Sequence, residues 1–164
     1  MAKGKVSPEL IEQFKQIVGE KYVYTDKDKL EPYSHDEVTD PHYMKEPQVV
    51  VLPATTEEVS KVVKLCYEND TVMVPRAAGT GLAAGAVATF GGVIISIERM
   101  NKILEIDKDN MVCVSEAGVT TSVLQDAVQK EGLFYGGDPA VGTPASSAVT
   151  LQPTLAATAL LNMA

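Results

Sequence analysis

Hydrophobic and polar positions follow a helical period near the N-terminus of this chain. Ser7-Pro8-Glu9 is typical of a helix start, with a capping hydroxyl, a proline in the first turn and an acid that favours the helix dipole. The residues that then share one face are Leu10, Ile11, Phe14, Ile17 and Val18, and Gly19 ends the element. The pattern predicts a helix that covers a core, whereas residues 25–47 show no sustained period and are expected to be irregular.

A β-α-β unit is predicted over residues 48–74. The continuous apolar run 48–53 has the length of a strand and ends at Pro53, as a buried strand would. Thr55 opens a capping box, and the helix after it has an inward face of Val59, Val62, Val63 and Cys66. Residues 71–74 follow as a second strand, which a right-handed crossover makes parallel to the first.

The period changes to that of strands after residue 90. Residues 93–97, 103–106 and 111–115 predict three strands, of which the last two form a hairpin. A turn at Gly118 and Val119 precedes an amphipathic helix with Val123, Leu124, Ala127 and Val128 on its apolar face, closed by Gly132. The order of a βαβ unit, a mixed β cluster and a helix predicts an α/β (α+β) fold.

Composition narrows the class of protein. The chain has 164 residues, 45% of them hydrophobic, and a net charge of −8, which disfavours a general nucleic-acid binder. No apolar stretch reaches the length that spans a membrane, so we expect a soluble protein without a transmembrane segment. Two cysteines are too few for a disulfide framework, and a reducing cytoplasm is the default.

A metal site is not expected. His35 and His42 share a segment with Asp36, Glu37 and Asp40, but their spacing matches no tetrahedral signature, and a solvated loop explains them better.

The candidate chemistry lies in a glycine-rich loop after the second strand. Residues 75–87 read Pro-Arg-Ala-Ala-Gly-Thr-Gly-Leu-Ala-Ala-Gly-Ala-Val, so few side chains fill the loop and backbone N–H groups can converge on an anion. A phosphate or pyrophosphate would gain charge from Arg76 and a hydroxyl from Thr80. On composition alone, a tight turn between buried strands explains the loop equally well.

Two familiar phosphate motifs do not fit. A dinucleotide fingerprint should open a long helix within the first βαβ unit, whereas this loop follows a complete βα pair and soon meets Gly91, Gly92 and a strand. A Walker loop is excluded because the chain has no Gly-Lys-Ser/Thr.

Four stretches together carry a family resemblance: residues 47–53, 75–87, 92–106 and 116–119. In order and spacing they resemble the FAD-binding domain of the vanillyl-alcohol-oxidase type (PCMH-type) flavoproteins, especially the branch of D-lactate dehydrogenase and the FAD subunit of glycolate oxidase. Tyr33-Ser34-His35-Asp36 also resembles that branch.

The resemblance implies the N-terminal half of a PCMH-type domain with FAD as cofactor. The residues expected to bind it are Pro75, Arg76, Ala77, Ala78, Gly79, Thr80, Gly81, Leu82, Gly118, Val119, Asp138 and Pro139. Ala77 and Ala84 stand where the family usually has glycine, so a positive φ at either position would be strained.

The resemblance also implies a reaction in the intact parent protein. A 2-hydroxy acid would pass hydride to the flavin, and electrons would then go to a quinone or another acceptor. The family's catalytic residues lie downstream, so no catalytic residue is assigned and this chain alone is expected to be inactive. The parent is expected in the cytoplasm or peripheral to the inner membrane.

The sequence divides into an N-terminal helix and irregular segment (1–46), the N-terminal part of an FAD-binding domain (47–139) and an aberrant tail (140–164). The tail carries no charged residue and has no clean period. Read one frame over from the last base of the Pro139 codon, permitted codons spell C-S-G-D-A-S-F-I-G-G-N-V-A-T-N-A-G-G-N. That string resembles the family's next motif, S-x-I-G-G-N-x-A-T-N-A-G-G, and suggests a frameshift near Pro139.

Other functional classes are left open. The chain is either an FAD-binding fragment of a 2-hydroxy-acid oxidoreductase or a small nucleotide- or phosphate-binding module without redox activity. A non-functional remnant is a third reading, which neither flavin nor nucleotide would stabilise against heat.

Overall fold

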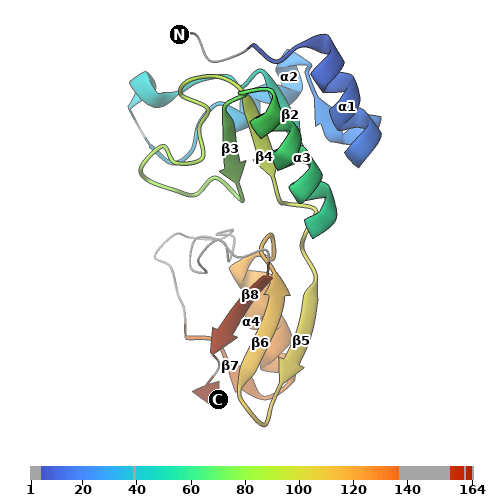
Figure 1. Ribbon diagram of the computed structural model, residues 1–164. Helices are drawn as coiled ribbons and strands as arrows, with labels where there is room; N and C mark the ends of the chain where they lie inside the picture. The colour runs from blue at the N-terminus through green and yellow to red at the C-terminus, as the bar shows by residue number, and fades with distance from the viewer. Residues whose placement is uncertain (1–4, 39, 137–155, 161, 164) are drawn as a thin grey trace. The chain divides into compact units, whose positions relative to one another are not determined.

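The computed structural model describes the chain except for residues 1–4, 39, 137–155, 161 and 164. The chain forms two compact units, Met1–Arg99 and Met100–Ala164, and each is described by itself (Figure 1).

The first unit is built on a four-stranded sheet. Its order is β1 (Val23–Tyr24), β2 (Val49–Val51), β4 (Val93–Ser96) and β3 (Met73–Arg76). Strand β1 is antiparallel to β2, while β2 and β3 both run parallel to β4, which lies between them. The predicted parallel βαβ unit is therefore confirmed, with a later strand inserted into its middle.

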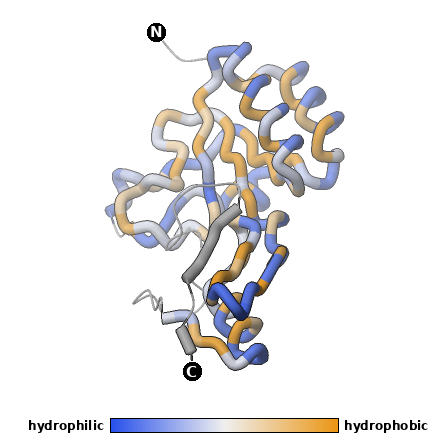
Figure 2. Tube along the Cα trace, turned by 60° about the horizontal axis from the view of Figure 1, so that its bottom comes forward, coloured by the Kyte–Doolittle hydropathy of each residue, from blue (hydrophilic) through white to orange (hydrophobic). Residues whose placement is uncertain are grey.

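Both faces of this sheet are covered, which explains why its inner strands β2 and β4 are almost wholly apolar. Helices α1 (Pro8–Val18) and α3 (Thr56–Glu68) cover one face, where Phe14 and Val62 pack with alternate strand residues such as Val49 and Val51. On the other face, Val50 and Ile94 pack with Leu30 and Ala88. In Figure 2 the interior of this unit is mainly coloured as hydrophobic, while the helices alternate between hydrophobic and hydrophilic residues.

The helix boundaries follow the predicted caps. Ser7 Oγ accepts from the N–H of Leu10, Thr55 Oγ1 accepts from the N–H of Glu58, and Gly19 ends α1 with a φ of 91°. Val62 and Cys66 of α3 are buried as predicted, but Val63 is 36% exposed and lies at the edge of that face.

Two sequence expectations for this unit need correction. The segment 25–47 contains short helical turns: α2 (Lys27–Leu30), η2 (Glu31–Tyr33) and η3 (Pro41–Tyr43), preceded by η1 (Glu20–Tyr22). Strand β3 extends through Arg76, so Pro75 and Arg76 belong to the strand rather than to the loop. Proline is tolerated there because β3 is an edge strand.

The second unit contains the predicted hairpin and helix. Strands β5 (Ile103–Asp107) and β6 (Val112–Glu116) pair antiparallel, and α4 (Thr121–Lys130) packs Leu124 and Val128 against Cys113. Val123, predicted on the apolar face of α4, is 49% exposed. Strand β7 (Leu133–Phe134) follows α4.

Most of the segment 140–164 lies outside the described residues. Its described part forms two strands that the sequence did not predict, β8 (Ala156–Leu160) and β9 (Asn162–Met163). Strand β8 pairs antiparallel with β6, and β9 pairs antiparallel with β7. The three-part division of the chain stays a prediction.

Within the described part of the chain, no helix is long and apolar enough to cross a membrane. Nor do the described residues bring three or more His, Cys, Asp or Glu side chains together as a metal site.

Candidate functional site

The glycine loop, defined here as residues 77–86, leaves edge strand β3 at its carboxyl end. This is the edge at which open α/β sheets bind ligands. The chain then returns through Val87 and Ala88, which are buried, to enter β4. The loop is therefore held by strand β3 on one side and by the buried residues Val87 and Ala88 on the other.

The backbone N–H groups of the glycine loop have no acceptor in the part of the protein that the structure describes. Among the described residues, none of the N–H groups from Ala77 to Ala86 donates a hydrogen bond to another part of the protein. Backbone donors that are free of protein acceptors are available to an anion.

Gly79 makes the conformation of the loop possible. Its φ is +72°, and a Cβ at this position would lie 2.3 Å from Nη2 of Arg76. Only glycine accommodates both the positive φ and the close guanidinium. Ala84 also has a positive φ, of 54°, so the backbone strain that the sequence suggested for this alanine is present. Ala77 does not have a positive φ and carries no such strain.

Arg76 is buried, and its guanidinium is occupied inside the protein. Nη1 donates to the carbonyl oxygens of His35 at 2.8 Å and Ala86 at 3.3 Å, and Nη2 donates to that of Pro32 at 3.1 Å. The guanidinium also lies over the ring of Tyr33. No ion pair to Arg76 is found among the described residues, and burial lowers its pKa.

A segment to which no sequence motif assigns a role, residues 36–38, packs against the glycine loop. The N–H of Glu37 donates to the carbonyl of Gly81 at 3.1 Å, and Asp36 is buried with Oδ1 accepting from the N–H of Val38. Two buried oxygens at this contact, Asp36 Oδ2 and Thr80 Oγ1, have no hydrogen-bond partner in the described structure. The only sequence signal for this contact was the family resemblance of residues 33–36.

Tyr33 links the same segment to the end of β4. Its hydroxyl donates to Glu98 Oε1 at 2.5 Å, and the Ser96 hydroxyl donates to the same oxygen at 3.0 Å. Burial and the neighbouring Glu98 raise the pKa of Tyr33, so its hydroxyl keeps its proton at neutral pH.

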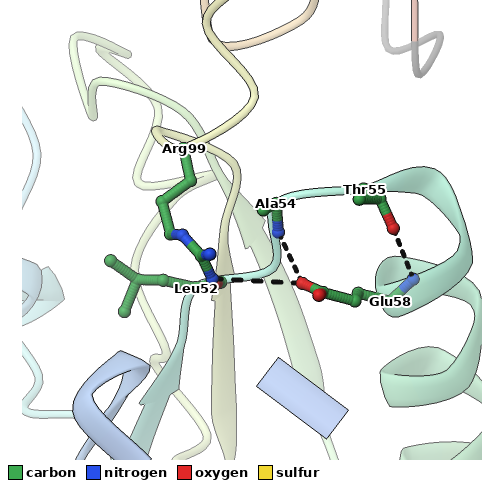
Figure 3. A network of polar contacts seen from close by, with 5 residues as sticks. All are labelled: Leu52, Ala54, Thr55, Glu58 and Arg99. Atoms are coloured by element: carbon green, nitrogen blue, oxygen red, sulfur yellow. Dashed lines mark hydrogen bonds and ion pairs between the residues drawn. The ribbon is translucent and has the colours of Figure 1, made fainter. Parts of the chain in front are cut away.

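A second arginine, Arg99, fastens the turn between β2 and α3 (Figure 3). Its Nη1 donates to the carbonyl of Leu52 at 2.6 Å and lies 3.9 Å from Glu58 Oε2, while its guanidinium covers the ring of Tyr22. Glu58 Oε2 in turn accepts from the N–H of Ala54 at 2.7 Å. This network holds sheet and helix together and does not reach the glycine loop.

The other predicted cofactor residues belong to the second unit or lie outside the described residues. The N–H of Gly118 donates to the carbonyl of Met100 at 2.8 Å, and that of Val119 donates to Glu116 at 3.2 Å. Val119 is 1% exposed, within the core of that unit. Asp138 and Pro139 are not described, and a role for these four residues in binding the cofactor stays a prediction.

The loop fits a dinucleotide pyrophosphate in its chemistry. Judged by the described residues, it combines N–H donors without a protein acceptor, a glycine where a side chain would collide, and a buried threonine hydroxyl without a partner. Each of these features favours an anionic, oxygen-rich group at this edge of the sheet.

Sequence comparisons agree with that chemistry. Residues 47–150 match the family model described as "FAD binding domain". D-lactate dehydrogenase of Anaerostipes hadrus is 44% identical over 83% of this chain, and glycolate oxidase subunit GlcD of Bacillus subtilis is 39% identical over 65% of it. The chain spans 28% and 22%, respectively, of the lengths of these two relatives.

Solved structures confirm the predicted fold. A p-cresol methylhydroxylase structure with substrate bound superposes with a TM-score of 0.68 and 27% identity, over 75% of this chain and 24% of that one. An alkyldihydroxyacetonephosphate synthase structure reaches a TM-score of 0.73 at 23% identity, over 85% of this chain and 28% of that one, and supports the fold alone. The chain therefore belongs to the FAD binding domain family of PCMH-type flavoproteins, whose cofactor is FAD.

Proposed function

We propose that the glycine loop binds the pyrophosphate of FAD through its backbone N–H groups. The observation that carries this proposal is the run of N–H donors from Ala77 to Ala86, none of which has a protein acceptor among the described residues. These donors lie at the carboxyl edge of the sheet, where a pyrophosphate would satisfy several of them at once. The remaining predicted cofactor residues, Gly118, Val119, Asp138 and Pro139, would contact other parts of FAD.

A longer protein that contains this FAD-binding domain would oxidise a 2-hydroxy acid. This proposal is supported by the similarity to D-lactate dehydrogenase and glycolate oxidase subunit GlcD, and to D-2-hydroxyglutarate dehydrogenase of Stutzerimonas stutzeri at 35% identity. FAD supplies a hydride acceptor in such chemistry, and a quinone or another carrier would take the electrons onward. The role of this chain is to hold the cofactor, and we expect the chain alone to be inactive.

A titration of the 164-residue chain with FAD tests the proposed binding. Flavin fluorescence and calorimetry should give saturable binding, with ADP competing because it carries the same pyrophosphate. FMN, which has a single phosphate, should bind more weakly. Tight binding of a nucleotide with no affinity for FAD would instead support the small nucleotide-binding module without redox activity.

We also propose that residues 140–164 are translated from a shifted reading frame. The support is the family-like motif that permitted codons spell in the neighbouring frame from Pro139 onward, together with the absence of charged residues from the segment. The family match itself continues to residue 150, past the proposed point of the shift.

The DNA sequence across the Pro139 codon tests the proposed frameshift. We expect the shifted frame to encode the glycine-asparagine motif and then a long open reading frame. A shifted frame that meets a stop codon, or that lacks the motif, would contradict the proposal and make the segment a genuine part of the protein.

A further inference from the structure

Arg76 joins three stretches of the first unit that are distant in sequence. Its own carbonyl accepts from the N–H of Ile97 at 3.0 Å, which fixes the residue to the end of β4. Its guanidinium donates to Ala86, at the far end of the glycine loop, and to Pro32 and His35 in the N-terminal segment. Arg76 therefore closes the loop on itself and ties it to that segment.

Three of the five N–H donors of the Arg76 side chain are directed to carbonyl oxygens of the protein. A phosphate that took these donors would leave the three carbonyl oxygens without them, and an acceptor left unpaired on folding is costly. The guanidinium also lies close against the Gly79 backbone, since a Cβ added to Gly79 would be only 2.3 Å from Nη2 and 2.5 Å from Cζ. Its planar fork suits several carbonyls at once, which a lysine ammonium cannot reproduce.

The N-terminal segment, residues 32–37, makes contacts at both of its ends. At one end, the ring of Tyr33 lies under the guanidinium of Arg76, and the Tyr33 hydroxyl donates to Glu98. At the other end, the N–H of Glu37 donates to the carbonyl of Gly81 within the glycine loop. The segment therefore contacts both the ends of the sheet strands and the glycine loop.

We propose that Arg76 is a positioning residue, which sets the conformation of the glycine loop through segment 32–37 and does not itself bind the cofactor phosphate. Segment 32–37 is consequently part of the cofactor site although it precedes the matched FAD-binding region. The inference rests on the proposed function, because it concerns how the proposed pyrophosphate loop is held.

The first test is hydrogen exchange in the 164-residue chain without cofactor. Arg76→Lys keeps the positive charge but loses the fork, so exchange at the Glu37 and Val38 amides should accelerate about tenfold or more. Arg99→Lys is the matched control, since Arg99 is held in the same unit by Leu52 and Glu58 and should leave those two amides unchanged. Unchanged exchange in Arg76→Lys would overturn the inference.

The second test is FAD affinity. Arg76→Lys should weaken FAD binding about tenfold, and the loss should accompany the faster exchange at Glu37 and Val38, because Arg76 acts through position. A loss of affinity with unchanged exchange at those amides would indicate a direct phosphate contact and would overturn the inference. Retained affinity would also overturn the inference. Should the wild-type chain bind no FAD, the proposed function fails, and the exchange experiment still decides the role of Arg76.

Tyr33 variants keep the inference testable if Arg76→Lys does not fold. Tyr33→Phe removes only the bond to Glu98, and Tyr33→Leu also removes the ring beneath the guanidinium. Both should accelerate exchange at Glu37 and Val38, with Tyr33→Leu having the larger effect. No acceleration in either variant would overturn the proposed role of segment 32–37 in positioning the glycine loop.

Discussion

At the scale of single residues, Ala84 is an alanine in a backbone conformation that favours glycine. Its φ of 54° falls in the left-handed region, which costs a residue with a Cβ about 1–2 kcal/mol relative to glycine. We predict that Ala84→Gly stabilises the first unit by about 1 kcal/mol, measured by urea denaturation. Ala77→Gly is the control, because Ala77 has no positive φ and should gain nothing. Destabilisation by Ala84→Gly would contradict this account of the strain.

At Gly79 we predict the reverse effect, because replacing this glycine by alanine should destabilise the chain. Gly79→Ala places a methyl group against the Arg76 guanidinium at a positive φ, so it should destabilise the chain by at least about 2 kcal/mol and abolish FAD binding. Gly85→Ala is the matched control in the same loop, since its φ is not positive and no atom lies within 4 Å of the added Cβ. Equal effects of the two substitutions in thermal denaturation and FAD titration would refute the special role of Gly79.

At the scale of elements, the Arg99 network joins sheet and helix. Arg99→Met removes the hydrogen bond to Leu52 and leaves Glu58, at 25% side-chain exposure, without its cation. We predict a loss of about 1–3 kcal/mol in the free energy of unfolding, because a charge-assisted bond of this kind is worth roughly that much. FAD affinity should stay within about twofold of wild type, since the network does not reach the loop. A large loss of affinity without a loss of stability would contradict this separation.

Local patterns predicted elements well because capping and periodicity act over a few residues. Ser7 and Thr55 cap the helices expected of them, and the hairpin of β5 and β6 forms where its turn residues stand. The insertion of β4 between β2 and β3 could not be predicted from these patterns, because strand order depends on contacts distant in sequence. The same limit explains why the sequence suggested Arg76 as a phosphate ligand and missed its three carbonyl partners.

At the scale of the whole molecule, each compact unit contains one buried cysteine. Cys66 lies in the core of the first unit and Cys113 in that of the second, and both are 0% exposed. Burial raises the pKa of the Cys66 thiol to about 11 and also raises that of Cys113. Both thiols should therefore resist alkylation in the folded chain.

Single-cysteine variants, Cys66→Ala and Cys113→Ala, turn these thiols into reporters of each unit. If the units unfold separately, alkylation in increasing urea should give a different midpoint for each thiol. Coincident midpoints would contradict independent unfolding, and rapid alkylation without denaturant would contradict the burial.

The raised Cys66 pKa also predicts an alkaline loss of stability. The folded thiol holds its proton up to about 11, whereas the unfolded thiol releases it near its ordinary 9.0, so the folded state binds more protons between these values. Stability should be fully present below pH 9.0 and fall by about 2–3 kcal/mol as the pH rises through 11. Urea denaturation at stepped pH should show this slope in wild type and a shallower one in Cys66→Ala. Identical slopes would exclude Cys66 as the cause.

The central claim, that the amides of the glycine loop bind pyrophosphate, is tested most directly by nuclear magnetic resonance. Inorganic pyrophosphate would be titrated into the ¹⁵N-labelled 164-residue chain, with Gly79→Ala as the comparison. We predict saturable shifts in the amide resonances of residues 77–86, larger than elsewhere in the chain and absent from the variant. Shifts confined to other residues, or none in residues 77–86 at millimolar pyrophosphate, would contradict the account.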